Sequence, residues 1–295
     1  QGFSLATRCD AIIAEESNYD DSISAAHKTI DECFEKIYKI DREELAVVQR
    51  HAEMRPPDRV WRPGFHTHSE KRAAAVAEMI SYVMGCAYGR WDVRFALDQS
   101  LIVQITDPFV SSPICPPGML VGPDGLPAEP DRIVSEEWLR ARPDAATLPP
   151  EGSVKNPTIP DSEYPLRISW DGVLVDDNGF NGDRPHRDDI VRRVREVFDL
   201  LWKDKSHEIE QEACDILGVS DLRDYFRKPA EFFQDHLRRY SKSRRKAPIY
   251  WPLSTASGSY TIWLYYHRLN EQTLYMVVNK YVEPKIAEVQ KEVDS

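Results

Sequence analysis

The stretch Leu237–Arg268 reads LRRYSKSRRKAPIYWPLSTASGSYTIWLYYHR and joins a cluster of cations directly to hydroxyl groups and aromatic rings. Within it, the β-prone segments Ile249–Leu253 and Ser259–Tyr266 flank a turn-forming Ser-Thr-Ala-Ser-Gly-Ser sequence, which predicts a β-hairpin. Upstream, Pro229 suits the first turn of a helix that runs to about Tyr240. That helix should turn Phe233, His236, Leu237 and Tyr240 inward and Arg238 and Arg239 outward.

Outside this stretch, the apolar spacing mainly predicts helices. Residues 10–40 carry Ile23, Ala26, Ile30, Phe34 and Ile37 at steps of three and four, the period of one helix face. A second helix is expected from the capping box Asp41/Glu44 to about His51. A third is expected from a cap at Ser69, with its apolar residues inward: Val76, Met79, Ile80, Val83 and Met84. Further helices are expected after a cap at Asp188 or Asp189, over His207–Leu217, after a cap at Ser220, and over Leu274–Val293. With a strand expected over Ile168–Val175, the predicted fold class is helix-rich α+β. It combines a helical scaffold with a small antiparallel sheet or hairpin region and no Rossmann-type cofactor domain.

Proline divides the chain into three expected regions. Thirteen of the 21 prolines lie between Gln104 and Pro165. Because proline blocks helix interiors and central strands, this part should be a mostly irregular connection that wraps a folded domain, with Val134–Arg142 helical. We therefore expect a helical scaffold over residues 1–103, the wrapping connection over 104–165, and an α+β region over 166–295.

Charge is distributed unevenly. The net charge is −11, yet residues 223–246 hold nine lysines and arginines against three acids. A local basic segment on an acidic body favours a directed contact with a polyanion such as double-stranded DNA, because attraction between charges in salt is short-ranged. The alternative is a solvated helix face beside a core element, and charge alone does not separate the two.

Composition also bounds the environment of the chain. Its five cysteines form no CxxC pair and are odd in number, which favours buried thiols in a reducing cytoplasm. No apolar run approaches the roughly 18–20 residues of a membrane span, so no membrane partner is expected. Because the chain begins at Gln1 rather than Met, we expect a processed or trimmed start.

Recognised catalytic patterns are missing from the sequence. It contains no GxGxxG, P-loop or HExxH pattern and no Asn/Asp-Pro-Pro-aromatic tetrad of an amino-methyltransferase. His66 and His68 form at most half of a metal site, and polar surface is the commoner role for such a pair. Asp176 and Asp177 follow a predicted strand as nuclease carboxylates do, but no (D/E)xK element follows and the acidic loop lacks calcium-loop spacing. We therefore predict no catalytic and no metal-binding residue on this chain.

Seven segments in a fixed order carry a family resemblance: IDECFEKIYKIDREEL (Ile30–Leu45), ISYVMGCAYGRWDVRFA (Ile80–Ala96), CPPGMLVGPDGLPA (Cys115–Ala128), DGVLVDDNGF (Asp171–Phe180), DDIVRRVREVF (Asp188–Phe198), EACDILGVSDLRDYFRKPAEFFQDHL (Glu212–Leu237) and YSKSRRKAPIYWPLSTASGSYTIWLYYHRLNEQTLY (Tyr240–Tyr275). Together they resemble the C-terminal part of adenine-specific DNA methyltransferases of the type IIG restriction–modification kind. They are most similar to the BREX phage-defence methyltransferases of the PglX type.

The resemblance implies an N6-adenine DNA methyltransferase whose S-adenosylmethionine fold and Asn-Pro-Pro-Tyr/Phe tetrad lie upstream of the matched segments. Because this sequence contains neither, we expect the chain to be the target-recognition half, with residues 166–295 as its DNA-recognition region. A catalytic domain or subunit that carries the cofactor would be its partner. The resemblance implies that the target-recognition half positions duplex DNA so that the catalytic half can flip an adenine out of the duplex. The expected phosphate contacts are Arg238, Arg239, Lys242, Arg244, Arg245 and Lys246, and the expected finer contacts are Ser254, Thr255, Ser257, Ser259 and Tyr260.

Two other functions stay open at this point. The chain is alternatively a protein-interaction subunit that docks the methyltransferase or another phage-defence protein with little contact to DNA. An autonomous enzyme such as a nuclease is a third reading, which the missing motif disfavours. Whichever holds, we expect Trp251, Trp263 and Tyr265 in the core rather than stacked on bases.

Overall fold

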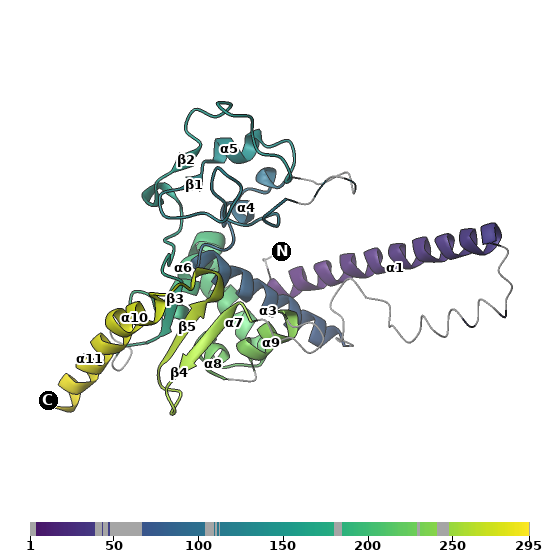
Figure 1. Ribbon diagram of the computed structural model, residues 1–295. Coiled ribbons are helices and arrows are strands. Elements are labelled where there is room, and N and C mark those ends of the chain that lie inside the picture. Colours follow the sequence, from purple (N-terminus) through teal and green to yellow (C-terminus); the bar gives the residue numbers. More distant parts are fainter. Residues whose placement is uncertain are drawn as a thin grey trace. The chain divides into compact units, whose positions relative to one another are not determined.

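Two compact units make up the computed structural model, which describes residues 4–38, 43, 47, 67–103, 109, 111, 113–179, 185–228, 231–240 and 248–294 (Figure 1). One unit comprises Gln1–Glu78 with Glu212–Gly218, and the other comprises Met79–Gln211 with Val219–Ser295. Helices dominate, and the two sheets are small and antiparallel, which confirms the predicted helix-rich α+β class. The division into three regions stays a prediction.

The described helices are mostly short. The α-helices are α1 (Leu5–Tyr38), α3 (His68–Ala87), α4 (Arg94–Leu97), α5 (Glu136–Ala141), α6 (Ile190–Trp202), α7 (Ser206–Leu217), α8 (Leu222–Arg227), α9 (Phe232–Tyr240), α10 (Thr273–Val277) and α11 (Glu283–Val293). The 3₁₀ turns are η1 (Gln99–Leu101), η2 (Asp161–Glu163), η4 (Lys203–Lys205) and η5 (Tyr266–Arg268), and η6 (Val278–Val282) is a π-helical turn. None of the helices in these ranges is long and apolar enough to cross a bilayer.

In the first unit, the long helix α1 is held at its N-terminus by a carboxylate. The hydroxyl of Ser4 and the amide of Leu5 donate to Glu212 at 2.6 Å each, so an acidic side chain satisfies amides that have no partner within the helix. The predicted helix over residues 10–40 is confirmed, but its apolar stripe is exposed, with Ile30 at 52% and Ile37 at 71%. The expected helix from Asp41 to His51 falls almost entirely outside the described residues.

The third predicted helix is confirmed, but its cap is not Ser69. The hydroxyl of Thr67 accepts from the Glu70 amide at 3.2 Å, while the Glu70 carboxylate accepts from the Thr67 amide at 2.8 Å. This reciprocal capping box places the helix start two residues before the predicted position. Of the residues predicted to face inward, Val76, Ile80, Val83 and Met84 are fully buried and Met79 is half-buried.

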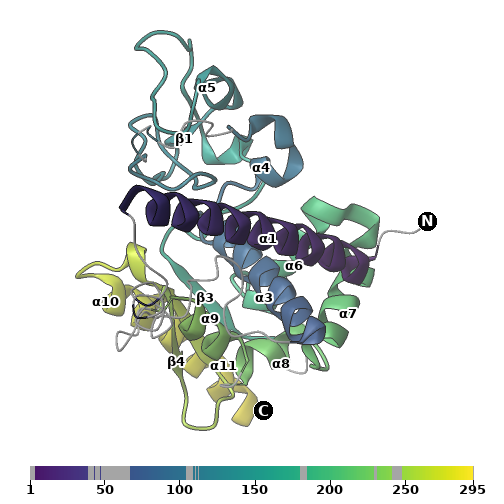
Figure 2. The same cartoon turned by 90° about the vertical axis from the view of Figure 1, so that its right-hand side faces the viewer.

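The second unit is built around a three-stranded antiparallel sheet in the order β3-β5-β4 (Figure 1), and Figure 2 labels its outer strands β3 and β4. Its strands are β3 (Val173–Asp176), β4 (Tyr250–Ser254) and β5 (Thr261–Tyr265), with Val173 opposite Leu264 and Tyr250 opposite Tyr265. The hairpin predicted from the sequence is β4–β5. A separate two-stranded ladder pairs β1 (Ile133–Val134) with β2 (Thr158–Ile159), inside the proline-rich region.

Alternate residues of the sheet enter two different cores. On one face, Ile262 and Leu264 pack with Val277 of α10 and Tyr281 of η6. On the other, Trp263 lies edge-on to Phe232 of α9 with ring centroids 5.4 Å apart, and Tyr250 stacks on Tyr88 at 5.2 Å. These aromatic contacts fix α9 beside the hairpin.

Three expectations near this sheet need correction. The strand begins at Val173 rather than Ile168, because Gly172 adopts a positive φ of 70° and forms a turn just before it. Asp189 caps α6 as expected, accepting from Arg192, but α8 is capped by Asp221 and not by Ser220. The closing run is helical as predicted but contains the π-helical turn η6, which ends two residues before Pro284, whose ring nitrogen has no hydrogen to donate.

Candidate nucleic-acid interface

The basic half of the candidate interface begins at the last turn of α9. Arg238 is exposed and lies 3.6 Å from the carboxylate of Asp235, and Arg239 is half-buried. Both arginines lie in the last turn of the predicted helix, as expected, but Arg239 is less exposed than the outward position predicted for it. The remaining predicted phosphate contacts Lys242, Arg244, Arg245 and Lys246 lie outside the described residues.

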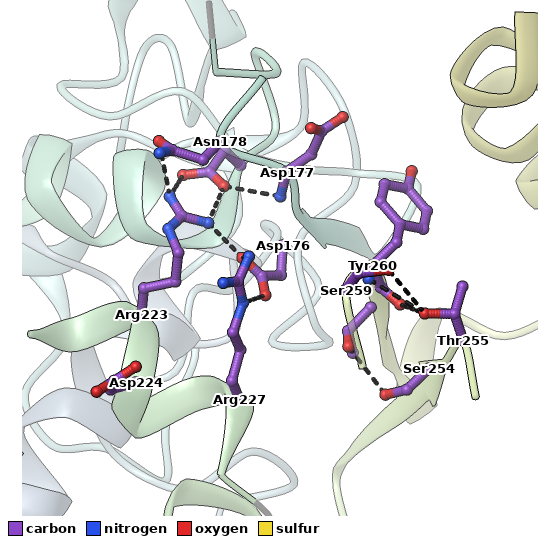
Figure 3. Close-up of polar contacts among 12 residues, drawn as sticks. Asp176, Asp177, Asn178, Arg223, Asp224, Arg227, Ser254, Thr255, Ser259 and Tyr260 are labelled. Atoms are coloured by element: carbon purple, nitrogen blue, oxygen red, sulfur yellow. Dashed lines mark hydrogen bonds and ion pairs between the residues drawn. The ribbon is translucent and has the colours of Figure 1, made fainter. Parts of the chain in front are cut away.

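The hydroxyl half lies at the tip of the β4–β5 hairpin (Figure 3). The Thr255 amide donates to the Tyr260 carbonyl at 3.0 Å, and the Gly258 amide closes a turn on the Thr255 carbonyl at 2.9 Å. Gly258 has a φ of 69°, which glycine adopts at little cost. A four-residue loop thus carries Ser257 and Ser259 beyond the sheet, where both are exposed.

The predicted contact hydroxyls bond to one another around this loop. Ser257 and Ser259 hydroxyls lie 2.7 Å apart, and the Thr255 hydroxyl lies 3.3 Å from that of Ser257. Ser254 pairs with Thr261 across the ladder at 2.9 Å. Because a hydroxyl has one hydrogen and two lone pairs, Ser259 with two partners and Ser254 with one still have capacity for a ligand. The structure therefore brings Ser254, Thr255, Ser257 and Ser259 together as one exposed polar tip.

Tyr260 differs from the other predicted contacts because it turns toward the body. Its hydroxyl donates to the Tyr281 carbonyl at 3.4 Å, and burial raises its pKa well above the ordinary value of a tyrosine. Among the aromatic residues, Trp263 and Tyr265 are buried in the core, as predicted. Trp251 is 43% exposed, so the prediction that it is core is wrong. It lies on the edge strand β4, opposite Leu264.

Sequence reasoning missed the residue that joins the two halves. His236 of α9 is 1% exposed, and its Nε2 accepts from the Ile249 amide at 2.8 Å, one residue before β4 begins. Burial first, and then the positive charges of Arg239 and Arg90, lower the pKa of His236 to about 3. A neutral imidazole therefore fixes the end of α9 to the start of the hairpin. Its inward position on an amphipathic helix was the available signal.

The acidic loop after β3 is an ion-pair network (Figure 3). Asp176 is 1% exposed and pairs with Arg223 and Arg227 of α8. Arg223 also pairs with Asp189, the α6 cap, at 2.9 Å, and Lys285 pairs with Asp177 at 2.8 Å. Carboxylates neutralised by guanidinium groups are poorly suited to hold Mg²⁺, so these contacts join β3 to α6 and α8 instead.

Metal ligands do not converge in the part of the chain that the structure describes. That part holds no group of three or more His, Cys, Asp or Glu side chains arranged to bind an ion. His66 lies outside it, and His68 is 3.5 Å from Asp10. His68 and Asp10 form an exposed polar contact at the start of α3, and one carboxylate with one imidazole does not complete a zinc coordination shell.

Comparison with known proteins gives two related methyltransferases. The chain is 26% identical over 241 residues to the adenine-specific methyltransferase BrxX of Escherichia coli O9:H4 (strain HS), which covers 76% of this chain and 15% of that protein. It is 30% identical over 121 residues to the adenine-specific methyltransferase PglX of Lacticaseibacillus casei (strain Zhang), covering 38% of this chain and 9% of that protein. No protein-family model matches the chain.

These similarities support a relationship to BREX-type adenine-specific methyltransferases. The chain spans less than a sixth of the length of either relative. The similarity thus concerns a limited portion of each methyltransferase, and it indicates a role related to a defence-system methyltransferase.

Proposed function

We propose that this chain is the DNA-binding, target-recognition part of an N6-adenine DNA methyltransferase of a restriction–modification or BREX-type defence system. One observation carries the proposal: the basic segment that begins with Arg238 leads, through the His236 contact, into the exposed hydroxyl tip of the β4–β5 hairpin. Cations and hydroxyls placed together are what the backbone and groove edges of a duplex require. The adenine-specific relatives supply the reaction class.

In this proposal the two halves of the interface have separate tasks. The cations from Arg238 to Lys246 bind phosphates and set the register on the duplex, without reading sequence. Ser257 and Ser259 at the hairpin tip approach base edges, and the Ser259 hydroxyl, which has two partners in the loop, has capacity for a bond to a base. Methyl transfer from S-adenosylmethionine belongs to a partner catalytic domain or subunit in the cytoplasm, outside residues 1–295.

The test is duplex binding measured by fluorescence anisotropy at about 50 and about 200 mM salt. Each phosphate contact contributes a salt exponent of about 0.9, so a fourfold rise in salt weakens binding about 3.5-fold per contact. Reversing two charges in Arg244→Glu/Arg245→Glu should therefore reduce the salt-induced weakening about 12-fold, in addition to weakening binding at low salt.

A matched control is available in the second unit. Arg132 lies within 4 Å of Asp124 and Glu129, and Arg140 lies within 4 Å of Asp98 and Glu136. Arg132→Glu/Arg140→Glu makes the same change in charge where carboxylates already surround the arginines, and should leave the salt dependence intact. Equal salt dependence of the wild-type chain and the Arg244/Arg245 variant would contradict the proposal.

Exposed apolar side chains on β4 and α10 favour the second candidate, a protein-interaction subunit. Trp251 is 43%, Leu253 46%, Leu274 64% and Tyr275 70% exposed, and large exposed apolar side chains often mark protein interfaces. This reading expects no salt-dependent duplex binding by the wild-type chain. It expects instead stable co-elution with the methyltransferase catalytic part, which Trp251→Ser/Tyr275→Ser should abolish.

A further inference from the structure

Arg90 follows α3 and lies between two aromatic rings. The centre of its guanidinium group is 4.6 Å from the Trp91 ring centroid and 5.2 Å from that of Tyr240, the last residue of α9. Trp91 itself fits against Gly85, where a Cβ atom would lie 2.3 Å from the indole, so the glycine makes room for the ring. Cation–π contacts on two sides hold the guanidinium in place. The group is therefore preorganised and half-buried.

Two other arginines of this unit that are removed from solvent have carboxylate partners. Arg94 pairs with Asp92 at 2.7 Å, and Arg223 pairs with Asp189 at 2.9 Å. Removing a cation from water is costly unless an anion or several acceptors replace the lost hydration. Arg90 departs from this pattern, because no described carboxylate lies within ion-pair distance of it.

Backbone carbonyls do not fill this role for Arg90 either. Arg142, which stacks on Trp138 at 5.0 Å, donates its Nε to the Thr147 carbonyl at 3.0 Å. Arg90 Nη1 donates to the Tyr240 hydroxyl at 3.3 Å, and the guanidinium group also interacts with the buried hydroxyl of Tyr250. Of its five N–H donors, most are therefore left for a ligand.

The charge around Arg90 is positive. Burial, and then the charge of Arg90, lower the pKa of His267, and the charges of Arg239 and Arg90 add to burial in lowering that of His236. The segment that follows Tyr240, SKSRRKA over residues 241–247, contains four cations and neither aspartate nor glutamate. An anion bound at Arg90 would relieve this repulsion and supply the acceptors that the guanidinium lacks.

We propose that Arg90, stacked between Trp91 and Tyr240, binds a backbone phosphate of the duplex and extends the basic segment of α9 onto the loop after α3. The proposal rests on the proposed function and adds to it a contact from a part of the chain 150 residues away from Tyr240. A planar guanidinium suits this ligand because it donates two parallel hydrogen bonds to one phosphate group. His267, exposed and under the influence of the same charge, lies near enough to report on the bound anion.

Arg90→Gln and its matched control Arg142→Gln test the contact by duplex anisotropy over a range of salt. Both variants remove one positive charge and one stack on a tryptophan. Arg90→Gln should weaken binding about tenfold and lower the salt exponent by about 0.9. Arg142→Gln should match the wild type. A folded Arg90→Gln chain with the wild-type salt exponent overturns the inference, and so does an equal loss in Arg142→Gln.

Two comparisons distinguish failure of the Arg90 contact from failure of the proposed function and from a folding defect. If Arg244→Glu/Arg245→Glu loses its salt dependence while folded Arg90→Gln does not, the proposed function stands and only the Arg90 contact falls. If Arg90→Gln fails to fold, the test uses the wild-type chain. The pKa of His267 is then measured by ¹H NMR with and without duplex, and His267→Gln identifies the His267 signal. Bound duplex should raise the His267 pKa. An unchanged value, or a rise with inorganic phosphate alone and none with duplex, overturns the contact.

Discussion

Acid should weaken the second unit through His236. The imidazole has an ordinary pKa of 6.5, which folding lowers to about 3 through burial and then through Arg239 and Arg90. Between these two values the unfolded chain binds the proton and the folded chain does not. The free energy of unfolding is therefore fully retained above about pH 6.5 and falls as the pH falls toward about 3.

The size of the effect follows from the two pKa values. The free energy of unfolding should be about 2 kcal/mol lower at about pH 5 than at about pH 8. It should fall by about 1.4 kcal/mol more for each further pH unit down to about 3. The physical cause is the Nε2 atom, which accepts from the Ile249 amide at 2.8 Å. A proton on Nε2 would replace that bond with a clash of two donors, beside two arginine charges.

Urea unfolding followed by circular dichroism at about pH 8 and about pH 5 checks this, with His236→Gln as the variant. Glutamine does not titrate, so the wild type should lose about 2 kcal/mol more than His236→Gln over this interval. The exposed residue His207 provides the control, and His207→Gln should keep the wild-type pH dependence. If the wild type and His236→Gln lose stability in parallel, the reasoning about a buried neutral imidazole is refuted.

Two further predictions concern packing around the sheet. Asp176→Asn removes the buried carboxylate that pairs with two arginines of α8, and should lower the free energy of unfolding in urea by about 3 kcal/mol. Asp98→Asn, at an exposed ion pair, should leave the unfolding midpoint unchanged. Similar losses of stability in both variants would argue against burial as the cause. Gly85→Ala places a methyl group 2.3 Å from the Trp91 indole and should cost about 1–3 kcal/mol and lower the melting temperature. Gly118→Ala has no atom within 4 Å of the added methyl, and isolates the backbone strain of a φ of 86°. Wild-type stability of Gly85→Ala would show that the ring moves away freely.

The sequence was sufficient for elements whose signals are local. The β4–β5 hairpin follows from two β-prone runs around Gly258, and the α6 cap follows from an Asp before an amphipathic run. Errors arose where two capping residues compete within one turn. Ser220 and Asp221 are both good caps, and Thr67 prevails over Ser69 because only Thr67 has a glutamate three residues later that reaches back to its amide.

Contacts between residues far apart in the sequence were beyond this reasoning. The partners of Asp176 lie 47 and 51 residues away, so a buried network looked like a solvated acidic loop. Similarly, the exposure of Trp251 depends on which strand lies at the edge of the sheet, since an aromatic residue in a β-prone run is equally consistent with core. Alternation along a strand does not specify strand order.

Two described residues on either side of the basic run 241–247 contact His236 of α9. The residue before it, Tyr240, has its ring 4.6 Å from His236 and its hydroxyl bonded to Arg90. Shortly after it, the Ile249 amide donates to the same His236. His236 and Arg90 therefore contribute to the proposed interface in different ways. His236 joins α9 to the start of β4, and Arg90 adds a cation that two aromatic rings already hold in place.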